Sequence, residues 1–501
     1  MTTSRGSAAN RRFVLAAAIL GSSMAFIDGS VVGVALPAIQ RELSASVRGA
    51  QWIVNGYMLM LGALLLVGGA AGDRFGRRRV FALGVLLFTA ASMACGLASS
   101  TAMLVASRLI QGVGAALLVP ASLAIITGAF EGAARGRAIG TWAGFSALTT
   151  AFGPVLGGWL VDAWSWRAIF FLNAPVALCV LLLLRRVPES TGHTGRVDFI
   201  GGALATLGLG AIAWGLTGAS DLGWTHGFVL GALAGGMVVL GLFVWWEGRA
   251  PAPMMPLAMF RSPAFSGANA MTFFLYFALS GSLFFLPFNL IRLQGYSAAA
   301  AGASFLPFTL IMGVLSRWSG GLLARYPARA LLTVGPLITA AGFALLAVPG
   351  IGGSFWVTFF PGMVVLGFGM AVSVAPLTTV VMSAVDGRHT GAASGVNNAA
   401  ARVAALLAVA LLGAVAVGVF GSALASRLDA IDAPPDVRSA MAQQVSRLAE
   451  AEVPAGVPAH LRSGLQRALD EAFLRSFRVV TLIAAAFAAI SGVCAAITLR
   501  E

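Results

Sequence analysis

The sequence predicts an all-α polytopic membrane protein, and both its composition and its long apolar runs indicate this class. Of its 501 residues, 58% are hydrophobic and only 10% are charged, and the mean hydropathy is +0.90. Soluble domains are about 25% charged, so this composition excludes them. Runs of about 20 apolar residues, the length with which an α-helix crosses a hydrocarbon core ~30 Å thick, recur between short polar breaks.

Fourteen apolar runs each predict a transmembrane helix. The N-terminus lacks the short apolar stretch and small-residue cleavage site of a secretory signal, so we expect the first run to remain in the mature protein. The predicted spans are residues 13–36, 50–71, 80–99, 101–127, 138–161, 168–184, 199–218, 227–246, 265–291, 299–323, 329–348, 355–381, 391–420 and 476–499.

Arginine counts predict the orientation of these spans. With the N-terminus inside, the two tails and the loops after even-numbered spans hold eighteen arginines, counting Arg329 at the first position of the span 329–348, against four in the short outer loops. Basic residues in short loops stay on the cytoplasmic side, so both termini are predicted to be cytoplasmic. The net charge of +14 then reflects topology, and we expect no nucleic-acid partner.

The residue types that the sequence lacks exclude two energy sources, ATP hydrolysis and light absorbed by retinal. The sequence contains no lysine, which excludes a Walker A loop and a retinal Schiff base. With abundant Ala, Gly and Pro, this arginine-only usage favours a GC-rich bacterial genome, and hence the bacterial cytoplasmic (inner) membrane. Cys95, Cys179 and Cys494 lack paired spacing, and the four histidines lie in different loops. We therefore expect no disulfide, no metal and no cofactor.

An internal repeat predicts two halves. When the sequence is aligned with itself at a shift of 251 residues, identical residues coincide at eight positions without a gap. This favours two parallel six-span bundles. The predicted organisation is a cytoplasmic tail (1–12), an N-terminal bundle (13–184), a linker (185–264) with an inserted hairpin (199–246), and a C-terminal bundle (265–499) with an outer loop (421–475). The superposed pairs are Gly62/Gly313, Gly69/Gly320, Arg74/Arg325, Gly84/Gly335, Gly136/Gly387, Arg137/Arg388, Gly140/Gly391 and Gly144/Gly395.

Three motifs resemble those of the major facilitator superfamily. The loop between spans 2 and 3 is similar to its signature loop, with the sequence Gly69-Ala-Ala-Gly72-Asp73-Arg74-Phe75-Gly76-Arg77-Arg78-Arg79. Span 4 resembles its second motif, with Arg108-Leu-Ile-Gln111-Gly112-Val-Gly114. Span 5 resembles the motif of its antiporters, with Gly153-Pro154-Val-Leu-Gly157-Gly158.

Span 1 extends the resemblance to one branch of that superfamily. Residues 28–37 resemble the Asp-x-Thr-Val-Val-x-Val-Ala-Leu-Pro signature of fourteen-span drug:proton antiporters, with Ser30 in place of Thr and Gly33 in place of Asn. The resemblance implies a major facilitator fold and proton-coupled efflux of hydrophobic or amphiphilic small molecules, such as drugs and antibiotics, by alternating access. A lipid or glycolipid exporter, and a membrane sensor or scaffold that does not transport, remain alternatives. We expect a monomer whose partners are substrate, protons and the bilayer.

Asp28 is the one carboxylate placed deep inside a hydrophobic span. An ionisable group in the bilayer is expensive to bury and marks a functional site with a partner. Arg108 has a similar predicted depth, about 10–12 Å below the outer face at ~1.5 Å per residue. If spans 1 and 4 adjoin, as the resemblance implies, this pair carries the transported proton. A static ion pair is the structural alternative.

Two further motifs predict moving parts. The loop with Gly69, Asp73, Arg74, Gly76 and Arg77 is predicted to turn sharply at Gly76 and to act as a conformational latch, with a purely topological signal as the alternative. The motif with Gly153, Pro154, Gly157 and Gly158 favours close helix packing, which makes it either a hinge or seal between the halves or a packing surface alone.

Polar residues inside predicted spans mark a possible substrate cavity, in which aromatic and methionine side chains would form an adaptable apolar wall. The outer loop is predicted to form a helical hairpin from two amphipathic stretches, and it either caps the outer vestibule or serves as a linker. The candidate cavity residues are Gln51, Asn55, Tyr57, Gln111, Asn269, Tyr276, Asn397, Asn398 and Arg402.

Overall fold

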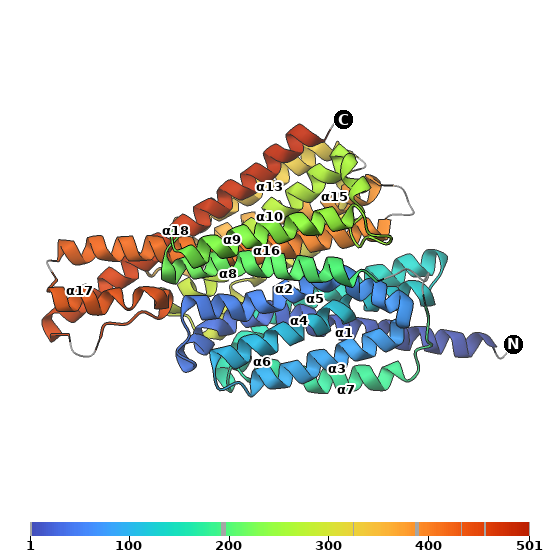
Figure 1. Ribbon diagram of the computed structural model, residues 1–501, viewed down its shortest axis with the longest axis horizontal. Coiled ribbons are helices and arrows are strands. Elements are labelled where there is room, and N and C mark those ends of the chain that lie inside the picture. The colour runs from blue at the N-terminus through green and yellow to red at the C-terminus, as the bar shows by residue number, and fades with distance from the viewer. Residues whose placement is uncertain are drawn as a thin grey trace.

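The computed structural model describes residues 3–191, 197–323, 325–385, 390–431, 433–454 and 457–499, and these contain helices and loops but no strand. Most of the long helices run side by side, with a smaller helical extension at one end (Figure 1). We call this the α17 end, after the short helix it contains. The opposite end, which carries the turn after residue 75, is called the Asp73 end.

The first group of helices forms one bundle. Within it α2 packs on α4, α3 on α4, and α1 on α5 and α7. Its elements are α1 (Thr3–Glu42), α2 (Val47–Phe75), α3 (Arg77–Gly96), α4 (Thr101–Ala129), α5 (Gly132–Ala163), α6 (Ala168–Phe171) and α7 (Asn173–Leu184).

The second group forms the other bundle. Here α13 packs on α15 and α18, α10 on α16 and α18, and α12 on α15. After the 3₁₀ turn η1 (Leu257–Arg261), its elements are α10 (Pro263–Arg292), α11 (Ala298–Ala303), α12 (Leu306–Leu322), α13 (Ala328–Leu346), α14 (Phe355–Thr358), α15 (Phe360–Ser383), α16 (Thr390–Ala430) and α18 (Ala459–Thr498).

Two helices lie between these bundles in sequence and cover the line where they meet. Helices α8 (Phe199–Leu222) and α9 (Gly227–Glu247) pack on one another, and α8 also contacts α2 and α16 (Figure 1). On α9 only a few side chains are buried, and Met237 and Val238 are each 64% exposed. This exposure places α9 at the periphery of the helix assembly.

Twelve helices in the described residues are long and apolar enough to cross a membrane, so this is a multi-pass membrane protein. The predicted number was fourteen. The two predicted spans outside the twelve are 138–161 and 168–184. The first lies in α5, a 32-residue helix whose side chains are only partly described. The second is the shorter apolar stretch Ala168–Leu184, which is divided between α6 and α7.

Local sequence signals set several helix boundaries. Ser46 and Ser100 cap α2 and α4, because each hydroxyl accepts a hydrogen bond from the amide three residues later, at 3.2 and 3.3 Å. The turn between α2 and α3 is made by Gly76, whose φ of 104° is strained for any residue with a side chain. The predicted sharp turn at this glycine is confirmed.

The predicted outer loop 421–475 has a different architecture from the separate hairpin that we expected. Helix α16 continues to Ala430 and α18 begins at Ala459, so two spans extend beyond the bundle and carry α17 (Pro435–Ala442) and the 3₁₀ segment η3 (Val445–Glu450) between them (Figure 1). The amphipathic pattern was nevertheless informative. Of its eight apolar residues, Val437, Met441, Leu448, Leu465, Leu469 and Phe473 are buried, and Val445 and Leu461 are partly buried.

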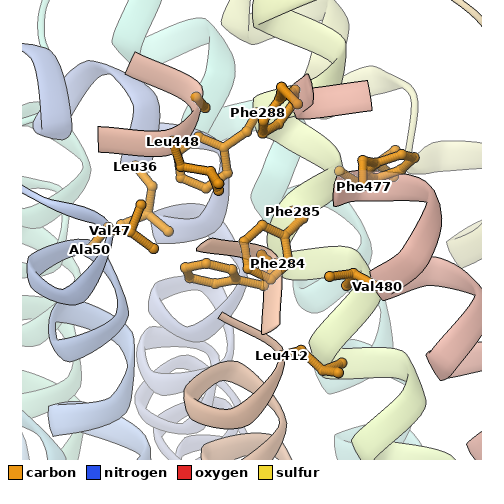
Figure 2. Packing of buried hydrophobic residues seen from close by; sticks show 14 of the residues in the cluster. Leu36, Val47, Ala50, Phe284, Phe285, Phe288, Leu412, Leu448, Phe477 and Val480 are labelled. Atoms are coloured by element: carbon orange, nitrogen blue, oxygen red, sulfur yellow. The ribbon is translucent and has the colours of Figure 1, made fainter. Parts of the chain in front are cut away.

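The largest apolar cluster joins both bundles at the α17 end. Leu448 of η3 is inserted between α1 and α2, which contribute Leu36 and Val47, and the phenylalanines of α10 (Figure 2). Its backbone has φ 50° and ψ −103°, a conformation that is uncommon for a residue with a side chain. Tertiary packing rather than local propensity therefore holds η3 in this place.

Candidate functional site

Asp28 lies in a buried hydrogen-bonded network between α1, α2 and α4. Arg108 Nη1 donates to Asp28 Oδ2, and Gln111 Nε2 donates to Asp28 Oδ1 at 2.8 Å. Arg108 Nη1 also donates to Gln111 Oε1 at 2.7 Å. All three side chains are at most 1% exposed. The predicted pairing of Asp28 with Arg108 is therefore present in the fold, and both carboxylate oxygens have donors.

Helix α2 completes the surroundings of Arg108. The guanidinium Nε donates to the backbone oxygen of Ile53 at 3.0 Å, and its carbon lies 4.3 Å from the centre of the Tyr57 ring. The Tyr57 hydroxyl donates to the backbone oxygen of Ala25 at 3.1 Å, which ties α2 to α1. Charge pairing, hydrogen bonds and a cation–π contact together compensate the burial of this arginine.

The candidate cavity residues do not form one site. Tyr57 and Gln111 belong to the Asp28 network, as described above. A second group faces the line between the bundles, where α2 packs on α16. Gln51 Nε2 donates to the backbone oxygen of Val409 at 2.8 Å. Gln51 Oε1 and both side-chain polar atoms of Asn55 are buried without a partner in the described structure. Unpartnered buried amides at a helix contact mark a place where another arrangement or a ligand would satisfy them.

Amide groups of α10 and α16 form a smaller cluster. Asn397 Nδ2 donates to Thr272 Oγ1 at 2.6 Å and to Asn269 Oδ1 at 3.3 Å. Its neighbour Asn398 is exposed and donates to the backbone oxygen of Ser394 at 3.0 Å. Tyr276 is partly buried on α10 and packs against the large cluster. The structure therefore brings Asn269 and Asn397 together and separates Asn398 from them.

Arg402 of α16 is the second arginine inside the bundle. Its Cβ is 3.0 Å from the position that a Cβ would take on Gly62, near the middle of α2, and its Nη1 lies 4.0 Å from the Met58 sulfur. Within the described residues no carboxylate lies within ion-pair distance of it. Unlike Arg108, it therefore has no ion pair with the part of the chain that the structure describes.

The motif of α5 lies where three helices approach closely. A Cβ on Gly153 would be 1.9 Å from Ser30 Oγ, and one on Gly157 would be 2.1 Å from a methyl group of Val31. The absence of a side chain on these glycines therefore allows α1 to pack closely against α5. A Cβ on Gly158 would be 2.2 Å from the backbone oxygen of Ala298 in the other bundle. Glycine is therefore required at position 158, where the neighbour is backbone, whereas a methyl group at 153 or 157 would force the side chain of Ser30 or Val31 to shift.

Helix α11 presents the matching small residue. A Cβ on Gly302 would be 2.1 Å from the backbone oxygen of Pro154. Asp162, one turn beyond Gly158, accepts hydrogen bonds from the amides of Ala298 and Ala299 at 3.1 and 2.7 Å. Sequence reasoning missed Asp162, because a carboxylate at a helix end gives no signal of a partner 136 residues away. Its contact with an N-terminal turn of the opposite bundle adds a charge-assisted link.

Segment η3 adds further links between the bundles at the same end. Gln40 Nε2 donates to the Arg447 backbone oxygen at 3.3 Å, and Arg41 lies 3.9 Å from Glu450. From the other bundle, Arg292 donates to the backbone oxygen of Ala449. Burial raises the pKa of Glu450, and the neighbouring arginines oppose that shift. In this structure the bundles are therefore joined at the α17 end.

The loop at the Asp73 end makes its contacts within the first bundle and with the segment that follows α7. Asp73 Oδ1 accepts hydrogen bonds from Arg77 Nε and Nη2 at 2.9 and 2.8 Å, and Arg77 Nη1 donates to the Ala124 backbone oxygen at 3.2 Å. The backbone amides of Arg78 and Arg79 donate to Glu189. Glu189 was not among the predicted residues. The side chain of Arg74 lies over Phe75, 5.3 Å from the ring centre, and Gly69 packs beside Pro120.

This fold and motif set match a known family. A family model described as Major Facilitator Superfamily matches residues 18–409. The chain belongs to this superfamily of membrane transporters. The transporter is 34% identical over 478 residues to multidrug resistance protein Stp of Mycobacterium tuberculosis (strain CDC 1551 / Oshkosh), an alignment that covers 94% of this chain and 89% of the relative.

Other relatives and solved structures extend this comparison. The tetracenomycin C resistance and export protein of Streptomyces glaucescens is 34% identical over 500 residues, covering 97% of the transporter and 91% of the relative. A bacterial homologue of the human lysosomal transporter Spinster, solved in an inward-facing and unoccupied conformation, superposes with a TM-score of 0.69 at 19% identity, covering 98% and 99% of the two chains. At this identity the likeness shows the fold alone.

Proposed function

We propose that this transporter is a proton-coupled antiporter that exports hydrophobic or amphiphilic small molecules by alternating access. The observation that carries the proposal is the buried network in which Arg108 and Gln111 hold both oxygens of Asp28. Relatives named for multidrug resistance and for tetracenomycin C export support the direction and the substrate class. The proton gradient across the membrane supplies the energy for export, and no cofactor takes part.

In this mechanism Asp28 exchanges one proton per cycle. While Asp28 is ionised, Arg108 neutralises it in the dry interior. Protonation removes that attraction and leaves Arg108 with the Ile53 carbonyl and the Tyr57 ring as its partners. Because α1, α2 and α4 all contribute to this network, a change in the charge of Asp28 alters how these helices pack. Proton binding is thereby linked to the conformation of the first bundle.

We propose fourteen spans in the bacterial cytoplasmic membrane, with both termini and the Asp73 end on the cytoplasmic side and the transporter acting as a monomer. The two spans beyond the apolar twelve are α5 and the α6–α7 pair, and α8 and α9 form the extra hairpin. The α17 end then faces outward. Since the bundles are linked there through Asp162 and η3, this state corresponds to the inward-facing step, and η3 acts as an outer cap.

A susceptibility panel tests the direction of transport. An efflux-deficient bacterial host that expresses the transporter should tolerate higher concentrations of apolar antibiotics than the host with an empty vector. Proteoliposomes with an imposed pH gradient should show substrate movement linked to proton movement. Altered envelope lipid without drug tolerance would favour the lipid exporter, and the absence of all three effects would favour a sensor or scaffold.

The latch loop yields a first prediction. Asp73→Asn removes the charge that holds Arg77 but leaves the loop arginines that retain the loop inside the cell. The ion pair is half-exposed, so its loss should cost about 1 kcal/mol or less. We expect normal insertion with transport slowed several-fold, measured as initial rates in vesicles at matched expression. Unchanged rates would leave topology as the only role of this loop.

Arg402 yields a second prediction, which concerns substrate charge. An arginine near the middle of the bilayer without a carboxylate partner in the described structure attracts anionic or electron-rich groups and repels cations. Arg402→Gln should reduce efflux of acidic amphiphiles by about tenfold, the effect of ~1.4 kcal/mol, and should spare cationic ones. The test compares the efflux rates of an acidic substrate, its neutral amide and the matching amine. Arg402→Lys is the control, because it keeps the positive charge and should keep efflux of the acid at the wild-type rate.

A further inference from the structure

A pair of carboxyl groups joins the ends of α8 and α9 at the Asp73 end. Asp198 is the N-cap of α8, and its Oδ1 accepts hydrogen bonds from Gly201 N at 2.8 Å and from Trp246 Nε1 at 2.9 Å. Glu247 is the last residue of α9, and its Oε2 accepts a hydrogen bond from the amide of Met255 at 2.8 Å. One oxygen of each carboxyl group is thus fixed by a donor of its own.

The other two oxygens, Asp198 Oδ2 and Glu247 Oε1, are buried and have no partner in the described structure. Both lie 2.6 Å from the same point, the position that a Cβ would occupy on Gly201, so they are close neighbours. Glu247 as a whole is only 3% exposed. The two oxygens are thus no farther apart than twice 2.6 Å. Ionised carboxylates only accept hydrogen bonds, so both oxygens would repel each other if both groups were ionised, and a proton held between them removes that repulsion.

Within the described residues, nothing else compensates these two free oxygens. Apolar residues of α2 and α16 cover the hairpin on the inner side, including Ala63 and Leu406, and Met254 and Met255 of the linker join the same cluster. No arginine in the described ranges is within ion-pair distance of either carboxyl group. Charged groups on α8 and α9 and on the elements packed against them have other contacts: Arg249 lies over Trp245, Asp73 pairs with Arg77, Arg74 lies over Phe75, Arg402 faces Met58, and Asp221 at the far end of α8 pairs with Arg48.

We propose that Asp198 and Glu247 form a second proton-binding site, in which one proton is shared between Asp198 Oδ2 and Glu247 Oε1. The shared proton turns a repulsive pair into a hydrogen bond between the start of α8 and the end of α9. Because Glu247 also holds the amide of Met255, the same proton fixes the linker that leads to α10. The site is independent of Asp28 and of the proposed direction of transport.

Infrared difference spectroscopy of the purified transporter in lipid nanodiscs tests this site directly. A protonated carboxyl group gives a carbonyl stretch that ionised groups lack. We expect this band near neutral pH, its loss as the pH rises, and its absence in both Glu247→Gln and Asp198→Asn. Asp221→Asn is the matched control, since it removes a carboxyl group from the opposite end of the same helix, and it should keep the band.

Thermal unfolding supplies a second measurement. The pair stabilises the transporter while the proton is bound, so the wild-type melting temperature should fall as the pH rises through the titration of the pair. In Glu247→Gln the side-chain amide can donate to Asp198 Oδ2 at any pH, so this part of the pH dependence should disappear. An unchanged pH dependence in Glu247→Gln and Asp198→Asn, or a melting temperature that follows sodium or potassium concentration without a carbonyl band, would overturn the proposal.

Discussion

Asp28→Asn should abolish proton-coupled export. Asparagine keeps the size of the side chain and still accepts a hydrogen bond from Arg108, but it cannot release or take up a proton. In proteoliposomes we expect no proton movement on addition of substrate, and accumulation against a gradient should fall to the level of vesicles without protein. Substrate binding should persist, which equilibrium binding measures separately.

A control is needed because Asp28→Asn also removes the negative charge that neutralises Arg108. Leaving one member of a buried ion pair alone costs about 3–5 kcal/mol, enough to lower the yield of folded protein. The double variant Asp28→Asn/Arg108→Gln removes both charges and should recover the melting temperature without recovering coupling. If either variant pumps substrate with the wild-type number of protons, Asp28 is not the coupling acid.

Gly158→Ala should block closure at the α17 end. The added methyl carbon would lie 2.2 Å from the backbone oxygen of Ala298, which cannot move aside as a flexible side chain would. Overpacking of this kind costs about 1–3 kcal/mol, so the equilibrium should shift away from the closed arrangement by roughly tenfold or more. We expect transport to fall to a similar extent at normal expression.

Cysteine accessibility measures that shift. Leu36 is fully buried in the cluster at the α17 end, so Leu36→Cys, in a background without the three native cysteines, should react slowly with a water-soluble maleimide. Adding Gly158→Ala or Gly302→Ala should accelerate the reaction. Gly241→Ala is the matched control, because no atom lies within 4 Å of its added carbon and neither transport nor labelling should change. Slow labelling in Gly158→Ala would show that this contact does not set the closed state.

Much of the fold could be predicted from local signals. A helix in a bilayer must be apolar over its whole length, so the spans and most of their boundaries were readable. Predicted span 13 ended too early and predicted span 14 began too late, because α16 and α18 continue beyond the apolar core as amphipathic helices. Two of the fourteen predicted spans lie outside the twelve that length and apolarity support in the described residues: 168–184 is divided between α6 and α7, and 138–161 lies in α5.

The same distinction holds for the candidate functional site: some of its residues could be selected from the sequence, and others only from the packing of the helices. A charge inside an apolar span has a high cost of burial wherever the chain folds, so Asp28 and Arg108 could be selected from the sequence alone. That Gln111 donates to the second oxygen of Asp28, and that Tyr57 lies under Arg108, was decided by the packing of α2 and α4.

The sequence by itself determined the membrane class, the family and the residues that are expensive to bury. Only the tertiary structure decided which residues far apart in the chain meet. Asp162 at α11, Glu189 at the latch loop, η3 between the bundles and the Asp198–Glu247 pair all depend on such contacts. The physical reason is that hydropathy acts on each segment separately, whereas hydrogen bonds and close packing require two surfaces whose relative position no single segment encodes.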